Sequence, residues 1–207
     1  MSSFRPVPSF PAHRGIEGSA FFAHRTVFQA FQPCTMRDEW SRLMQLDIDI
    51  EDPWPAGDWE ALAERVAQCA ISVAPELGNE RLAASLLFTS DSQVHELNRE
   101  WRQRDKPTNV LSFPMLERED LLELQADGPP ELLGDIALAC QTCAREAAEK
   151  GVSLQDHAAH LVLHGLLHLA GYDHEISAAD ADAMEAMETK ALAQMGIGNP
   201  YEEPQTE

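Results

Sequence analysis

The stretch from His160 to Glu175, H-L-V-L-H-G-L-L-H-L-A-G-Y-D-H-E, constrains the fold of this chain more than any other. His164 and His168 are four residues apart, so on a helix they project from one face, a turn apart. Gly171 follows where a helix would end, because glycine enters the left-handed backbone conformation without steric cost. Such a turn can bring His174 back towards the first two histidines. The spacing therefore predicts that His164, His168 and His174 bind one metal ion.

The histidine content favours a zinc site. Three neutral imidazoles with an open fourth position suit a catalytic Zn²⁺ ion, and we expect one per chain. Five of the eight histidines fall between His157 and His174, which isolated core histidines would not explain. His160 is the main rival ligand, but a fourth histidine would close the coordination sphere. We therefore expect His160 and Asp173 to contact the ligands from outside that sphere, and His157 to be partly exposed.

One position separates this stretch from a metalloprotease. The spacing matches the metzincin zinc signature H-E-x-x-H-x-x-G-x-x-H everywhere except at Gly165, which replaces the glutamate that activates water. Glycine can neither accept a proton nor orient a nucleophile. We expect Gly165 to leave room beside the metal instead. A zinc-dependent peptidase or another hydrolase stays an alternative, which would need a base elsewhere in the chain.

Three ordered blocks of sequence resemble one family. The run from His164 to His174 is similar to the signature of the YbeY-type endoribonucleases, which are bacterial rRNA maturation factors. Leu97 to Pro114, L-N-R-E-W-R-Q-R-D-K-P-T-N-V-L-S-F-P, and Leu132 to Ala139, L-L-G-D-I-A-L-A, resemble that family's other blocks in the right order. The resemblance covers the chain from Leu46 to Tyr201.

The resemblance implies a zinc-dependent, single-strand-specific endoribonuclease. It implies a role in maturing the 3′ end of small-subunit rRNA and in ribosome quality control. The implied partners are rRNA and the small ribosomal subunit or its assembly factors. A non-catalytic, ribosome-associated zinc protein is the alternative from another class, because zinc could simply hold the helix and loop together.

Arg102 is the expected catalytic partner of the metal. Its position in W-R-Q-R-D-K-P-T matches the arginine that the resemblance associates with activity. A guanidinium can bind the charge that develops on a phosphate through paired hydrogen bonds. The alternative is a salt bridge to Asp105 or Glu100. The expected substrate contacts are Lys106, Thr108 and Ser112.

The net charge of −20 argues against a protein that coats a long nucleic acid, since RNA and DNA binding draw on Lys and Arg. Basic residues gather instead in the short segment Arg99–Lys106. A local basic patch on an acidic body is compatible with a nuclease that meets RNA at one small site. We do not expect DNA as a partner.

The chain divides into three parts. Residues 1–44 read as a flexible extension, or as the product of a wrongly assigned start, with Met36 or Met44 as the true beginning. Residues 45–201 form the expected catalytic domain, and residues 202–207 an acidic, disordered tail. No apolar run approaches the about 20 residues of a membrane span and no signal-peptide core is present, which predicts a cytoplasmic protein without membrane contact.

Periodicity and turn signals predict an α+β fold, in which a small mixed sheet of about four strands packs with helices in a single domain. The zinc site is placed on a C-terminal helix and the following loop. The expected strands are Leu46–Ile50, Leu82–Thr89, Asn109–Phe113 and a last one around Ile136. The expected helices are Trp59–Val73, one capped by Ser90 or Ser92, Thr142–Lys150, Leu154–Ala170 and Ser177–Met195.

Overall fold

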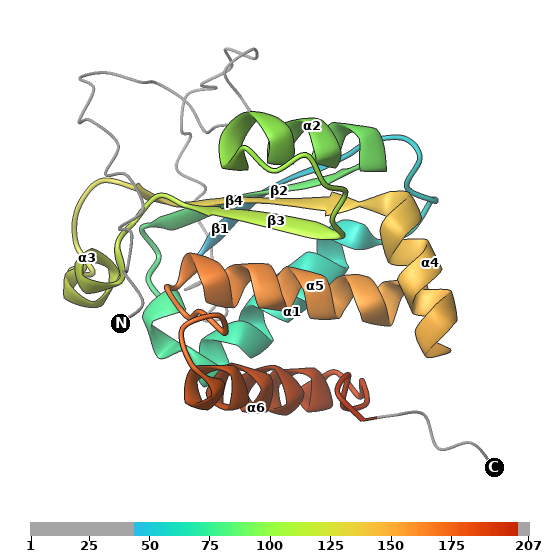
Figure 1. The fold of residues 1–207 in the computed structure, drawn as a ribbon. Coiled ribbons are helices and arrows are strands. Elements are labelled where there is room, and N and C mark those ends of the chain that lie inside the picture. The colour runs from blue at the N-terminus through green and yellow to red at the C-terminus, as the bar shows by residue number, and fades with distance from the viewer. Residues whose placement is uncertain (1–43, 203–207) are drawn as a thin grey trace, which may run out of the picture.

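The computed structural model of the chain describes residues 44–202, as Figure 1 shows. The expected N-terminal extension and the acidic tail lie outside these residues, apart from Met44 and Glu202, and stay predictions. The strands are Gln45–Ile50 (β1), Leu82–Thr89 (β2), Val110–Pro114 (β3) and Glu131–Ala139 (β4). The helices are Trp59–Val73 (α1), Asp91–Arg102 (α2), Arg118–Glu123 (α3), Cys140–Lys150 (α4), Leu154–Leu169 (α5) and Ala178–Gln194 (α6), with a 3-10 turn at Pro75–Leu77 (η1).

The four strands form one mixed sheet in the order β1-β2-β4-β3. β1 and β4 run parallel to β2, whereas β3 is antiparallel to β4 and forms an edge. Within this pairing Ser112 lies opposite Ile136. The expected α+β domain with a small mixed sheet is confirmed.

The helices cover the sheet unequally. In Figure 1, α2 lies on one face of the sheet, while α1 and α5 lie on the other and α6 packs beyond them. α5 occupies the centre of the second layer, where it contacts β3, β4, α1, α4 and α6. Most of its side chains are buried, as expected for a helix that is apolar on nearly all sides. The element that carries the histidine motif is therefore part of the core.

Side-chain caps fix where the helices begin. Asp58, Ser90, Ser153 and Ser177 each accept a hydrogen bond from the backbone N–H three residues later, at the start of α1, α2, α5 and α6. Such caps satisfy N–H groups that have no partner within the helix. Ser90, rather than Ser92, begins α2. The predicted bounds of α1, α4, α5 and α6 agree with the structure to within two residues.

The acidic stretch between β3 and β4 contains a helix that was not predicted. α3 spans six residues, too few to show a helical period, and it buries Leu121, which is 3% exposed. Within residues 44–202, no helix is both long enough and apolar enough to cross a membrane.

Candidate metal centre

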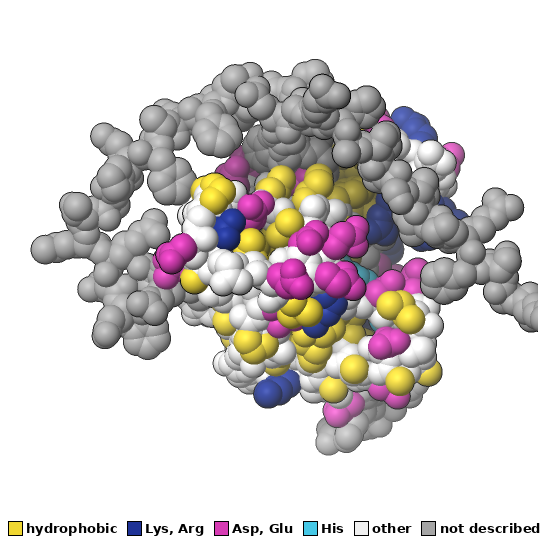
Figure 2. Space-filling model, turned by 90° about the vertical axis from the view of Figure 1, so that its left-hand side faces the viewer, with side chains coloured by type: hydrophobic (Ala, Val, Ile, Leu, Met, Phe, Trp, Pro, Cys, Tyr) yellow, Lys and Arg dark blue, Asp and Glu magenta, His cyan; other side chains and the backbone are white. Residues whose placement is uncertain are grey.

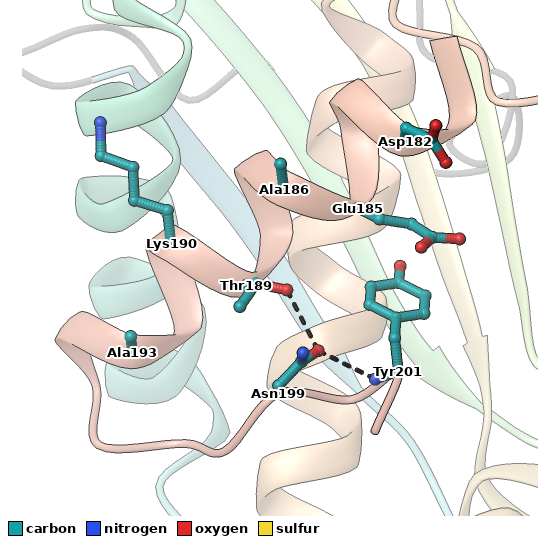
Figure 3. A pocket seen from close by; sticks show the side chains of 8 residues that line it. All are labelled: Asp182, Glu185, Ala186, Thr189, Lys190, Ala193, Asn199 and Tyr201. Atoms are coloured by element: carbon teal, nitrogen blue, oxygen red, sulfur yellow. Dashed lines mark hydrogen bonds between the residues drawn. The ribbon is translucent and has the colours of Figure 1, made fainter. Parts of the chain in front are cut away.

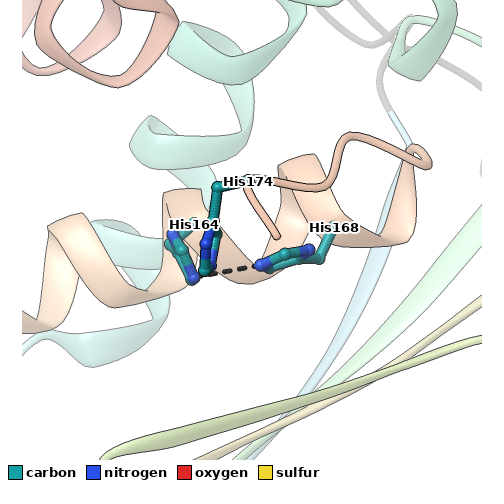
Figure 4. Close-up of side chains that lie close together, drawn as sticks. All are labelled: His164, His168 and His174. Carbon is teal, nitrogen blue, oxygen red and sulfur yellow. Dashed lines mark hydrogen bonds between the residues drawn. The ribbon is translucent and has the colours of Figure 1, made fainter. Parts of the chain in front are cut away.

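The three predicted histidines converge in space. His164 and His168 lie half-buried on α5, and exposed His174 comes from the loop after it, so that one nitrogen of each lies within 4.8 Å of the others. The Nε2 atoms of His164 and His168 are 3.1 Å apart. Figure 4 shows the three rings facing one another beside α5. The helix-plus-loop geometry predicted from the spacing is present.

Gly171 makes the turn that returns His174 to the helix. Its φ of 82° lies in the left-handed region, which side chains disfavour. Its N–H donates to the carbonyl oxygen of His168, and the N–H of Tyr172 donates to that of Leu167, both at 3.0 Å. These bonds end α5 in the manner of a glycine C-cap.

A clamp from α3 and η1 holds this turn. The Arg118 guanidinium donates to the carbonyl oxygen of Ala170, stacks 4.2 Å over the Tyr172 ring and pairs with Glu76 at 3.1 Å. The Tyr172 hydroxyl also donates to Glu76, at 2.8 Å. A Cβ at Gly171 would lie 2.8 Å from Cβ of Arg118, so the glycine also allows this close approach. The unpredicted helix α3 thus supports the loop that carries His174.

Glu188 on α6 completes the surroundings of the histidines, and sequence reasoning missed it. Its carboxylate is fully buried and accepts hydrogen bonds from Nδ1 of His164 and Nε2 of His160, both at 2.8 Å. Burial alone would raise the pKa of Glu188, but the bonds from the two histidines and Tyr201 lower it to about 2. One signal existed: a glutamate stands within the apolar stripe of α6 that includes Met184 and Leu192.

The two α5 histidines outside the cluster, His157 and His160, have different environments. His160 is 8% exposed; its Nε2 bonds Glu188, and its ring lies edge-on to that of His164, with the centres 6.4 Å apart. Its expected place outside the coordination sphere stays a prediction. His157 is 3% exposed and bonds Glu146 of α4 at 2.8 Å. The expectation of a partly exposed His157 was wrong, because α4 packs over that end of α5. The Asp173 carboxylate accepts from the N–H of Glu175 and so stabilises its own loop.

The donor set fits a divalent metal ion of the zinc class. Burial, with the neighbouring His164 and His174, lowers the pKa of His168 to about 4, so this imidazole is neutral at neutral pH. Neutral imidazole is the form that binds metals. The proton on Nδ1 of His164 is directed at Glu188, so the lone pair of its Nε2 faces the cluster, where Nε2 of His168 lies 3.1 Å away. The three residues can therefore hold a divalent metal ion.

Gly165 does not face the metal cluster. It is buried, and a Cβ built on it would lie 2.9 Å from Cδ1 and 3.0 Å from Cγ2 of Ile136 on β4. The expectation that Gly165 leaves room beside the metal was wrong. The glycine instead permits close packing of α5 against the sheet, a contact that the local spacing of histidines does not reveal.

Arg102 lies at the end of α2, beside the edge strand. Its Nη2 donates to the carbonyl oxygen of Ser112 at 2.7 Å, and its guanidinium lies 5.7 Å from the centre of the Phe113 ring. Partial burial and the Arg104 charge lower the pKa of Arg102, while Glu175 and Asp173 oppose that shift. Arg102 therefore interacts electrostatically with the two acids that flank His174.

The alternative contact of Arg102 is not observed. Among residues 44–202, no ion pair joins Arg102 to Glu100 or Asp105, and Asp105 pairs instead with His95 at 2.7 Å. The three expected substrate contacts differ in exposure: Lys106 is exposed, Thr108 is half-buried and Ser112 is 6% exposed. Their roles stay predictions.

The surface around the site is mainly acidic. Figure 2 shows a small histidine surface beside Lys and Arg side chains, on a face where Asp and Glu side chains are numerous. The short basic segment Arg99–Lys106 ends α2 and continues into the following loop. Four basic residues thus lie in one short segment, although single Lys and Arg side chains also lie elsewhere on this face (Figure 2).

Comparison with known proteins finds one matching family. The sequence profile of the family described as "Endoribonuclease YbeY" matches residues 48–196. A protein of that name from Erythrobacter litoralis is 61% identical over 158 residues, which cover 76% of this chain and 98% of the relative. Another, from Novosphingobium aromaticivorans, is 58% identical over 158 residues, covering 75% and 95%.

A solved structure is also similar. The solution structure of TM1509 from Thermotoga maritima matches with a TM-score of 0.48 and 22% sequence identity. The matched region covers 79% of this chain and 100% of the TM1509 chain. The family profile extends over most of the sheet, α5 and the histidine loop, and each of the two relatives matches about three quarters of the chain. The chain therefore belongs to the YbeY family.

Proposed function

We propose that this protein is a zinc-dependent endoribonuclease that cleaves single-stranded RNA. We place its activity in the cytoplasm, in the 3′-end maturation of small-subunit rRNA and in ribosome quality control. Its partners would be rRNA and the small ribosomal subunit or its assembly factors. The names of its relatives support RNA cleavage, and the family resemblance supports the ribosomal role.

One observation carries the proposal. Three imidazoles converge within 4.8 Å, and the guanidinium of Arg102 interacts with the acids that flank one of them. A metal site and a cation held at the edge strand β3 therefore lie close enough to interact through the acids beside His174. Phosphodiester hydrolysis needs both parts, because charge builds on the phosphate oxygens as the bond breaks.

The histidines and Arg102 would have different roles in the proposed reaction. His164, His168 and His174 would hold the ion, which supplies Lewis-acid chemistry when bound. Arg102 would bind the non-bridging phosphate oxygens, since its fork of donors matches them. The bond to the Ser112 carbonyl holds the guanidinium at the strand edge and leaves its other N–H groups for substrate.

The alternative functions have weaker support. A peptidase would need a base in place of the metzincin glutamate, and Gly165 at that position faces Ile136 rather than the histidines. A non-catalytic zinc protein would not need a guanidinium beside the site. Both alternatives remain testable with the same purified protein.

The direct test compares two substrates. Zinc-loaded protein should cleave single-stranded RNA and leave unfolded casein intact, and a chelator should stop the RNA cleavage. Chelator-sensitive proteolysis without RNA cleavage would indicate a peptidase. Zinc binding without either activity would indicate a scaffold.

Arg102 variants distinguish a catalytic role from a structural one. Arg102→Ala should slow RNA cleavage by about 10²–10³-fold, with unchanged zinc content, because it removes a donor to the developing charge. Arg102→Lys should recover only part of the rate, since an ammonium cannot make the paired contact. Single-turnover cleavage rates, melting temperature and zinc analysis provide the measurements.

Arg99→Ala is the matched control for this series. Arg99 lies on the same helix in the same basic segment, and among residues 44–202 no hydrogen bond or ion pair joins it to the edge strand that holds Arg102. This variant should cleave RNA within a few-fold of the wild-type rate. A wild-type rate in Arg102→Ala would move the phosphate-binding role to Arg99, Arg104 or Lys106.

A further inference from the structure

The metal ligand His164 is part of a buried polar network that reaches α6 and the segment after it. Glu188 lies at its centre with no exposed surface. Its Oε1 accepts from Nδ1 of His164, and its Oε2 accepts from Nε2 of His160 and from the Tyr201 hydroxyl. A fully buried carboxylate is costly unless it is paired in this way.

The contact with Glu188 determines which nitrogen of His164 faces the cluster. A carboxylate only accepts hydrogen bonds, so the imidazole proton must be on Nδ1. The lone pair is then on Nε2, and that atom lies 3.1 Å from Nε2 of His168. The hydrogen bond to Glu188 therefore sets both the tautomer and the ring orientation that metal binding needs.

His160 and Tyr201 hold the carboxylate from its other side. The His160 ring centre lies 6.4 Å from that of His164, and its Nε2 is directed at Glu188 rather than at the cluster. Tyr201 comes from the segment that follows α6 and donates to the same oxygen. With both partners in place, Oε2 is saturated and Oε1 is left for His164.

The position of Tyr201 is itself fixed by α6. Asn199 Oδ1 accepts from the Thr189 hydroxyl at 3.1 Å and from the N–H of Tyr201 at 3.0 Å, which Figure 3 shows as dashed lines. These bonds dock the C-terminal segment beside a shallow pocket on α6 that Glu185 also lines. Tyr201, which follows the last histidine, His174, by 27 residues in the sequence, is thereby connected to the metal site.

We propose that Glu188 is a positioning residue of the metal centre, held by His160 and Tyr201, so that α6 and the C-terminal segment set the metal affinity of a site built on α5. This inference rests on the proposed zinc-dependent function. It assigns no contact with substrate to Glu188. Its prediction concerns metal affinity, with activity changing only as a consequence.

The test measures zinc affinity by competition with a chromophoric chelator, at a temperature far below unfolding. Glu188→Gln should bind zinc about 10–100-fold more weakly than wild type, the usual effect of removing a partner that orients a ligand. Tyr201→Phe should weaken binding in the same direction by less, because Oε2 keeps the His160 bond. Glu185→Gln, on the same helix and beside Tyr201, should bind zinc as wild type does.

A second readout separates positioning from general stability. Nitrogen-15 NMR of the zinc-free protein should show His164 with its proton on Nδ1 in wild type and Glu185→Gln. In Glu188→Gln this tautomer should be less populated, since the neutral amide is a weaker acceptor. A variant that was only less stable would lower the melting temperature without changing the tautomer.

The outcomes distinguish this inference from the proposed function. Wild-type zinc affinity and an unchanged His164 tautomer in Glu188→Gln would overturn the positioning role and leave the nuclease proposal intact. If wild type bound no zinc, the proposed function would fail and the inference with it. If Glu188→Gln did not fold, Tyr201→Phe would decide, because its side chain lies at the partly exposed end of the network.

Discussion

At the residue scale, histidines of one helix have different chemical environments. His164 and His168 of α5 face His174, whereas His160 bonds Glu188 and His157 bonds Glu146. All four positions on α5 follow helical spacing, so the spacing alone does not distinguish ligand from structural histidine. The neighbour across the packing interface makes that distinction.

His157 should make the metal-free protein less stable in mild acid. Burial lowers the pKa of His157 below its ordinary value of 6.5, an effect that Lys150 and His160 add to and the bond to Glu146 opposes. The unfolded chain therefore binds a proton that the folded chain does not as pH falls below 6.5. The free energy of unfolding therefore decreases as pH falls, by up to about 1.4 kcal/mol per pH unit for one proton.

The measurement is the free energy of unfolding of chelated protein between pH 7.5 and 5.5, for wild type and His157→Gln. The variant should be less stable throughout but show a shallower pH slope. Chelation removes the metal from both proteins, so the difference between slopes isolates His157. Equal slopes would show that His157 is protonated in the folded chain as readily as in the unfolded chain.

At the element scale, α5 presents a different neighbour to each of its sides. One side carries the ligands, another packs Gly165 against Ile136 of β4, and its C-terminal turn is clamped by Arg118 of α3. A metzincin glutamate at position 165 would point into the sheet of this fold. The packing of α5, and not only its chemistry, separates this site from a protease site.

Gly165→Glu should destabilise the fold instead of creating a peptidase. The Cβ of the new side chain would lie 2.9 Å from Cδ1 and 3.0 Å from Cγ2 of Ile136. Its carboxylate would place a charge in the core. Overpacking with an unpaired buried charge should lower the free energy of unfolding by about 3 kcal/mol or more. Urea denaturation measures this loss, and Gln155→Glu on the exposed side of α5 is the control. A stable Gly165→Glu protein with peptidase activity would contradict the packing.

At the scale of the whole molecule, the candidate site connects parts that are distant in sequence. The histidines come from α5 and its loop, their supports come from α6, α3 and η1, and Arg102 comes from α2 across the sheet. A metal held by residues that converge only in the folded chain binds that chain preferentially. Its binding free energy therefore adds to stability.

Zinc should raise the melting temperature of wild type and not that of His168→Ala. At a free zinc concentration of about 100 times Kd, mass action stabilises by about 2.7 kcal/mol, or about 5–10 °C for a domain of this size. His168→Ala lacks one of three ligands and should also lose most of its bound zinc. Scanning calorimetry with and without chelator gives the shift. An equal shift in both proteins would show that zinc binds elsewhere.

Local sequence signals determined a large part of this protein. Capping residues such as Ser153 and Ser177 define helix starts because they act within one turn, and their effect needs no tertiary contact. The three histidines were predicted for a similar reason, since a helix and a glycine turn bring them together over 11 residues, from His164 to His174. The order of strands and helices along the chain likewise predicted the small mixed sheet.

Tertiary structure alone decided what faces each of these elements. Glu188 reaches His164 from a helix 24 residues further on, and Arg118 reaches the Ala170 carbonyl from 52 residues earlier. Periodicity identifies the buried side of a helix, but not which residue of another element meets it there. For the same reason the burial of His157 and the contact of Gly165 with Ile136 could not be read from α5 itself, because packing brings these distant residues together.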